Sequence, residues 1–208
     1  MCSGETDVSP LLFYLVAEGA VASHKEAAET KPSAKKEEEN MKITTQRLEI
    51  HPMCQAEWRD ILELFRDFSA SPAVIYDFPL PTSEEKAKEQ VRIWAESGFF
   101  YSVCLRGESR VIGYLCFPGE QERDFGYLFH RQWHGKGYAQ EAARAMMQEL
   151  HEKDGVCRFT AELALENEAS RKLAERLGFV QVGSNERIFH KEQGRVMRCG
   201  IFALELPK

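Results

Sequence analysis

The sequence predicts an α/β (α+β) fold, in which a mixed central sheet of about six to seven strands carries helices on both faces. Three observations support this. Residues 125–130 (FGYLFH) are typical of a short buried strand, and a glycine-rich turn separates them from a helical pattern that begins at Tyr138. Residues 156–164 alternate apolar and polar side chains, as a half-buried strand does. Residues 55–68 place their apolar side chains on one helical face.

The first half of the domain is predicted to contain three strands and two helices. Residues 45–53 are strand-like, and the helix over 55–68 follows them. Thr82 and Glu85 have the spacing of a capping box, which predicts the start of a second helix that ends at Gly98. Residues 99–105 and 110–117 then form two strands joined by a turn at Gly107.

The second half is predicted to contain the central strand, two helices and three further strands. The helix from Tyr138 follows the glycine turn, and residues 156–164 form the next strand. Asn167 is placed to cap a helix that Gly178 ends. Residues 179–190 and 195–206 form the last two strands, which we expect to be a hairpin around 192–194.

Composition changes along the chain and divides it into two parts. Residues 24–40 are rich in Ala, Glu and Lys, which is typical of a mobile tether. We therefore expect residues 1–40 to be a flexible N-terminal extension and residues 41–208 to form one domain, since 208 residues are enough for one sizeable core.

Charge and cysteine usage limit the function classes. A net charge of −6 argues against nucleic-acid binding and favours a cationic partner such as an amine. The six cysteines show no CxxC spacing, so we interpret them as reduced thiols of a cytoplasmic protein and predict no metal site. No segment has the length and apolar character of a membrane span, so no membrane association is expected.

The glycine turn is a candidate anion site. Gly135 and Gly137 permit a tight bend. The helix that follows them directs free backbone N–H groups and the positive end of its dipole toward a ligand in front of the turn. Such a turn is suited to a phosphate or pyrophosphate group.

Two separated motifs resemble one enzyme family. They are FGY at 125–127 with GKGYAQEA at 135–142, and NEAS at 167–170 with LGF at 177–179. Together they resemble the GNAT superfamily of acetyl-CoA-dependent N-acetyltransferases, and TQRL at 45–48 adds a likeness to the RimJ/RimL branch of ribosomal-protein alanine acetyltransferases. The likeness covers about residue 41 to the end, and the order of the motifs makes it far more specific than a lone glycine turn.

The resemblance implies that acetyl-CoA is the cofactor and which residues bind it. Pantetheine is expected along the strand at 127–129 and the pyrophosphate at the backbone of the turn. The Asn-capped helix is expected to contact the pantetheine or the adenosine end of the cofactor. The implied cofactor-binding residues are Tyr127, Leu128, Phe129, His134, Gly135, Lys136, Gly137, Tyr138, Ala139, Gln140, Asn167 and Ser170.

The family's Q/R-x-x-G-x-G/A pattern fits this turn in two registers. Gln132 with Gly135 and Gly137 matches it literally, whereas matching the flanking residues puts His134 in the first place. We favour the second register, because it starts the helix where the apolar periodicity starts.

Acetyl transfer to an amine requires a proton acceptor, and two carboxylates are candidates. Asp124 opens the central strand, and Glu162 lies on the polar face of the strand over 156–164. Either is equally well interpreted as a solvated acid at a strand end. By resemblance, the general acid is a Tyr seven residues after Asn167, but that position is Ala174. The acid is left open: it is another group such as Tyr138, Ser170 or water, or it is absent.

The predicted function is transfer of acetyl from acetyl-CoA to a primary amine by direct attack in a ternary complex. The acceptor is open among a protein N-terminus, an amino acid, a polyamine and another small amine. The alternative is an acyl-CoA-binding module with weak or no transferase activity, which Ala174 favours. Tyr76 and Asp77 lie in a loop that either lines the acceptor site or only connects two helices. A monomer and a homodimer are both compatible with the sequence.

Overall fold

The computed structural model describes residues 41–119, 122–190 and 195–207. The extension expected at 1–40 and the hairpin turn expected at 192–194 lie outside this part of the chain. The described residues form nine strands and four α-helices, with short 3-10 turns between them. None of these helices combines the length and apolar character needed to cross a lipid bilayer.

The first sheet is antiparallel and has the order β1-β2-β3-β4-β6. Its strands are β1 (Ile43–Thr44), β2 (Leu48–Pro52), β3 (Phe100–Leu105), β4 (Val111–Cys116) and β6 (Gly126–Phe129). Every residue of β4 is buried, because helices cover both faces of this sheet.

The second sheet has the order β5-β7-β9-β8. Its strands are β5 (Glu122–Asp124), β7 (Arg158–Ala164), β8 (Val180–Arg187) and β9 (Met197–Glu205). The β5–β7 pair is parallel and the other two pairs are antiparallel. The strands expected at 179–190 and 195–206 do pair with each other as β8 and β9.

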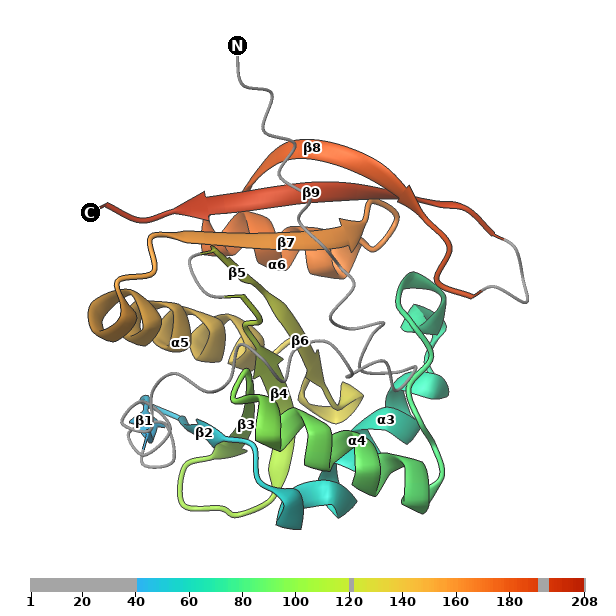
Figure 1. The fold of residues 1–208 in the computed structure, drawn as a ribbon, viewed down its shortest axis with the longest axis vertical. Helices are drawn as coiled ribbons and strands as arrows, with labels where there is room; N and C mark the ends of the chain where they lie inside the picture. Colours follow the sequence, from blue (N-terminus) through green and yellow to red (C-terminus); the bar gives the residue numbers. More distant parts are fainter. Residues whose placement is uncertain (1–40, 120–121, 191–194, 208) are drawn as a thin grey trace, which may run out of the picture.

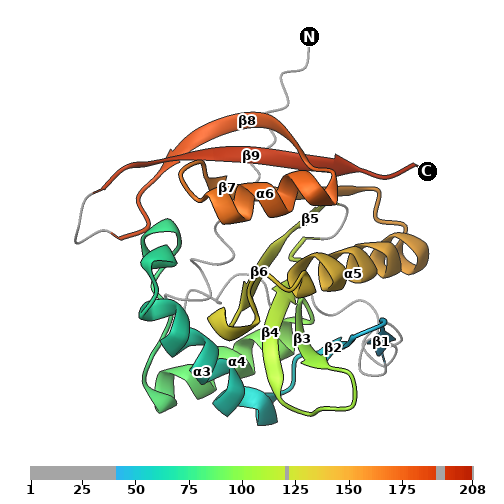
Figure 2. The ribbon, with the colours of Figure 1, turned by 180° about the vertical axis from the view of Figure 1, so that it is seen from behind.

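Four helices complete the fold: α3 (Trp58–Ser69), α4 (Glu84–Ser97), α5 (Tyr138–Asp154) and α6 (Glu168–Leu177). Figures 1 and 2 show α3 and α4 on one side of the first sheet and α5 on the other, with α6 against the second sheet beside α5. Two hydrophobic clusters follow this division: one joins α5 and α6 to the sheets, and the other lies under α3 and α4. The predicted α/β class with helices on both faces is confirmed.

The structure differs from the sequence-based expectation at the central strand. The strand predicted at 125–130 is β6, and a further short strand that was not predicted, β5, directly precedes it and belongs to the other sheet. The mixed sheet expected as one unit of about six to seven strands is therefore divided into sheets of five and four strands. Strands as short as β1 and β5 carry no readable alternation, which is why they were missed.

The predicted capping box at Thr82 is wrong. Ser83 is the N-cap of α4, since its carbonyl accepts the first helical bond from Ala87 N at 3.0 Å. Thr82 lies one residue outside the helix, where its carbonyl accepts from Arg66 Nε at 3.1 Å.

Candidate active site

The chain changes sheets at Phe125. Its backbone N–H donates to the Thr160 carbonyl of β7 at 2.7 Å, which extends the β5–β7 pairing by one residue. From Gly126 onward the chain pairs with β4 instead, up to the bond from His130 N to the Ile112 carbonyl at 3.1 Å. Figure 1 shows β5 and β6 as one continuous run from the second sheet into the first. The edge of β6 that faces away from β4 therefore has no partner strand among the described residues.

The register determines which backbone groups lie on that free edge. The His130–Ile112 bond makes Leu128 and Tyr114 a hydrogen-bonded pair, since such pairs alternate along an antiparallel ladder. Tyr127 and Phe129 consequently direct their N–H and C=O groups away from β4. Of the three residues expected to meet pantetheine, Tyr127 has an open N–H and C=O and Phe129 an open N–H, since the Phe129 carbonyl accepts from the His134 side chain. The backbone groups of Leu128 belong to the ladder.

The glycine turn between β6 and α5 has the predicted form. Gly135 and Gly137 have φ values of 73° and 81°, in the left-handed region that disfavours other residues. Gly137 is the N-cap of α5, so the helix begins where the favoured register of the family pattern places it. In the described part of the chain, no group accepts a hydrogen bond from the backbone N–H groups of residues 135–140. The helix dipole adds positive potential in front of them.

The side chains of the turn fasten it in place. His134 Nε2 donates to the Phe129 carbonyl at 2.8 Å, which ties the turn to the free edge of β6. The Lys136 ammonium lies 4.4 Å from the centre of the Trp133 ring. This cation–π contact keeps a positive charge on the turn.

Asn167 and Ser170 connect α6 to β6. Asn167 caps the helix as predicted, because its Oδ1 accepts from Ser170 N at 3.2 Å. The Ser170 hydroxyl lies 3.0 Å from the Tyr127 hydroxyl. Burial raises the pKa of Tyr127, so this phenol stays protonated at neutral pH. Ala174, one turn further along α6, is buried in the core.

The two candidate bases come together. Asp124 pairs with Thr160 of β7, whose hydroxyl donates to the Asp124 carboxylate at 3.4 Å. Burial and, to a smaller extent, the negative charge of Glu162 together raise the pKa of Asp124 to about 7, while the hydrogen bond from Thr160 opposes them. Glu162 itself is held by Arg187 through two hydrogen bonds of 2.7 and 3.0 Å. The carboxylates thus have different environments: one is free to change its protonation state and the other is ion-paired.

Asp77 reaches the same region from the loop before α4. Burial raises the pKa of the Cys116 thiol well above its usual value, and the charges of Asp124 and Asp77 add to this effect. Both carboxylates therefore lie close enough to act on one thiol at the end of β4. This position supports the interpretation of the loop as part of the acceptor site.

A divided sheet with a free strand edge, next to a turn of unpaired amides, defines the class of this protein: it is an acetyl-CoA-dependent acetyltransferase. Residues 47–180 match the family model described as an acetyltransferase (GNAT) domain, and the chain belongs to this family.

Known proteins similar to the chain agree with this assignment. An uncharacterized N-acetyltransferase, YnaD of Bacillus subtilis, is 29% identical over 147 residues, which cover 69% of this chain and 85% of YnaD. A GNAT-family acetyltransferase structure from Bacillus anthracis superposes with a TM-score of 0.70 at 25% identity, covering 79% of this chain and 98% of that one. RimL, a ribosomal L7/L12 α-N-protein acetyltransferase solved with coenzyme A, has the same fold, with a TM-score of 0.70, 19% identity and coverage of 80% and 98%. RimL belongs to the branch that the sequence motifs resemble.

Three features of the site were missed from the sequence. The partner of Glu162 is Arg187, 25 residues away, and no local pattern pairs them. The Tyr127–Ser170 contact joins two motifs that lie far apart in the sequence. Arg47 is part of the TQRL motif, but the sequence gives no sign that its side chain contacts the glycine turn directly.

Proposed function

We propose that the protein transfers acetyl from acetyl-CoA to a primary amine by direct attack in a ternary complex. The pantetheine arm lies along the free edge of β6, and the pyrophosphate lies at the N–H groups of residues 135–140. The observation that carries this proposal is that these six amides have no acceptor among the described residues, although the His134–Phe129 bond ties their turn to the open edge of β6. Backbone N–H groups on that edge are suited to polarise the thioester carbonyl.

Asp124 is the proposed proton acceptor. An alkylamine has a pKa of about 10, so the acceptor arrives as an ammonium that must lose a proton before it attacks. Asp124 has a pKa of about 7, which suits a base that works near neutral pH. Glu162 is the less suitable base, since Arg187 occupies both of its oxygens.

The hydroxyl pair of Ser170 and Tyr127 is the proposed proton donor to the departing thiolate. It lies between α6 and the free edge of β6, one helical turn before Ala174. Tyr138 is less suited to this role, because the Arg47 guanidinium stacks over its ring at 4.6 Å and the Trp133 ring packs edge-on against the same ring.

The charge around the site favours a cationic acceptor. Asp77, Asp124 and Glu162 supply three carboxylates, of which only Glu162 has an arginine partner in the described residues. An ammonium group is attracted to such a region. A protein N-terminus and a small primary amine both fit this requirement, and an enzyme similar in fold, from Salmonella typhimurium, modifies the N-terminal serine of L7/L12.

The direct test follows release of the free CoA thiol from acetyl-CoA with a panel of N-terminal peptides, amino acids, polyamines and other small amines. We expect turnover with at least one class of primary amine and none with matched N-acetylated compounds. Tight acetyl-CoA binding by calorimetry without turnover on any amine would favour the acyl-CoA-binding module instead.

Substitution of Glu162→Gln is expected to shift the pH dependence more than the maximal rate. The negative charge of Glu162 raises the pKa of Asp124, so its removal lowers that pKa. The acid limb of kcat/KM should move to lower pH, while kcat at pH 8.5 stays within about tenfold of wild type, because Asp124 still accepts the proton. A large loss of kcat together with the disappearance of the acid limb would show instead that Glu162 is the base.

A further inference from the structure

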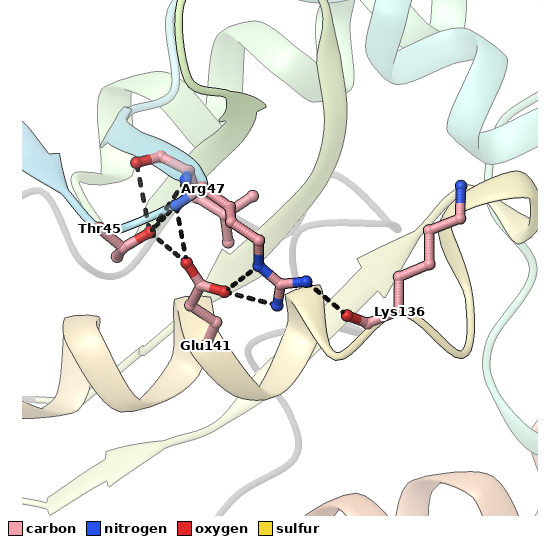
Figure 3. A network of polar contacts seen from close by, with 5 residues as sticks. Thr45, Arg47, Lys136 and Glu141 are labelled. Atoms are coloured by element: carbon pink, nitrogen blue, oxygen red, sulfur yellow. Dashed lines mark hydrogen bonds and ion pairs between the residues drawn. The ribbon is translucent and has the colours of Figure 1, made fainter.

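Arg47 joins the start of the domain to the glycine turn. Its guanidinium donates through Nη1 to the Lys136 carbonyl at 2.9 Å, and through Nε and Nη2 to Glu141 Oε2 at 2.7 and 2.6 Å. The other oxygen of Glu141 accepts from the Arg47 backbone N–H at 3.1 Å and from the Thr45 hydroxyl at 2.6 Å. Figure 3 shows the guanidinium between the turn and the first turn of α5.

The contact with Lys136 fixes the direction of one amide. The Lys136 carbonyl and the Gly137 N–H belong to the same planar peptide unit and point in opposite directions. Because Arg47 holds the carbonyl on the side of β2, the Gly137 N–H points to the opposite side. Gly137 lies among the six amides proposed to bind the pyrophosphate, and glycine itself offers little resistance to rotation of its peptide planes.

The contact with Glu141 controls charge near the same amides. Partial burial raises the pKa of Glu141, but hydrogen bonds from Thr45 and Arg47 outweigh it and hold the pKa below its usual value, so this residue is a carboxylate at neutral pH. An unpaired carboxylate in the first turn of α5 would oppose the binding of a diphosphate at the same helix end. Arg47 pairs with this charge and keeps the potential in front of the turn positive.

We propose that Arg47 is a positioning residue for the donor: it orients the turn at residues 135–137 and neutralises Glu141, so that the diphosphate part of acetyl-CoA binds. This inference rests on the proposed function, because it assumes that the diphosphate lies at this turn. Arg47 acts through the backbone of the turn and takes no part in the acetyl transfer itself.

The test compares two donors with the Arg47→Met variant, which keeps the length of the side chain but removes its charge and donors. Acetyl-CoA carries the diphosphate, whereas S-acetylpantetheine has the same thioester arm without it. We expect kcat/KM for acetyl-CoA to fall about 10- to 100-fold, mostly through KM, since charge-assisted hydrogen bonds are lost. For S-acetylpantetheine, kcat/KM should stay within about twofold of wild type.

Two further variants separate positioning from general stability. Arg92→Met removes an arginine that pairs with Glu89 and Glu96 on α4, and it should leave the ratio of the two donors unchanged. The double variant Arg47→Met/Glu141→Gln should regain part of the loss with acetyl-CoA, because the unpaired carboxylate is gone. Thermal unfolding of each variant confirms that the compared proteins are folded at the assay temperature.

The outcomes distinguish this inference from the proposed function. If wild-type protein uses both donors with equal kcat/KM, the diphosphate does not bind productively at the turn, and the role of Arg47 is overturned although the acetyl transfer stands. If wild-type protein turns over neither donor, the proposed function itself fails. If wild type prefers acetyl-CoA and Arg47→Met keeps that preference, the proposed function stands and the role of Arg47 is overturned. An equal fall with both donors would likewise overturn it, since that result indicates a general structural loss.

Discussion

The Asp124→Asn variant is expected to bind acetyl-CoA with wild-type affinity and to transfer acetyl about 10²- to 10⁴-fold more slowly, the usual contribution of a general base. Asparagine has nearly the same shape and can keep the contact with Thr160, but it cannot accept the amine proton. Steady-state release of the CoA thiol at pH 8 gives kcat, and calorimetry gives the Kd for acetyl-CoA. Asp154→Asn, at an exposed carboxylate beside Arg123, is a suitable control.

The pH dependence of kcat/KM and of stability gives a second test of Asp124→Asn. Wild-type kcat/KM should fall about tenfold per pH unit below about pH 7, where Asp124 becomes protonated, and the variant should lack this limb. Because the folded state holds the Asp124 proton more tightly than the unfolded state, the free energy of unfolding should decrease as pH rises from about 4 to about 7. Asp124→Asn should remove that part of the decrease. Wild-type turnover in the variant would exclude Asp124 as the base.

The Gly137→Val variant is expected to weaken acetyl-CoA binding by about tenfold or more. An added Cβ has space here, since the nearest atom to it would be Arg47 Nη2 at 3.5 Å. The backbone of a valine, however, is strained by about 1–2 kcal/mol at the φ of 81° that Gly137 adopts. Without ligand, the turn of the variant can relax away from this conformation. Binding of acetyl-CoA then has to restore the strained conformation, which weakens the affinity. Calorimetric titration with acetyl-CoA measures the change in Kd.

Gly107 provides a matched control for Gly137. It has the same φ of 81°, lies in the turn between β3 and β4, and has no atom within 4 Å of an added Cβ. Gly107→Val should therefore lower the melting temperature to a similar extent but leave the Kd for acetyl-CoA unchanged. Gly137→Asn should bind better than Gly137→Val, because asparagine tolerates the left-handed conformation. Equal Kd values for Gly107→Val and Gly137→Val would contradict a specific role of the turn.

Much of the fold could be predicted because its signals are local. The start of α5 at Tyr138, the Asn167 cap of α6 and the end of α6 at Gly178 depend on residues a few positions apart. The same is true of the glycine turn, whose amides are unpaired because they begin a helix. The alternation over 156–164 likewise placed Phe159 in the core and Glu162 on the opposite face of β7.

The division of the sheet could not be predicted, because it depends on which strand offers the better partner on each side of Phe125. A run such as FGYLFH has the same local pattern whether it pairs with one neighbour or changes between two. The pairing with β7 up to Thr160 and with β4 from Gly126 onward decides that the edge of β6 stays open.

The sequence by itself determined the family motifs, the helix boundaries around the turn and the residues able to carry charge at the site. Only the tertiary structure decided what those charges do. Asp124 has a pKa near neutrality because β7 buries it beside Glu162, and Arg47 reaches Glu141 across 94 residues of chain. Pairing between distant segments and removal of water change the free energy of a charge, and both depend on the packed fold rather than on neighbouring residues in the sequence.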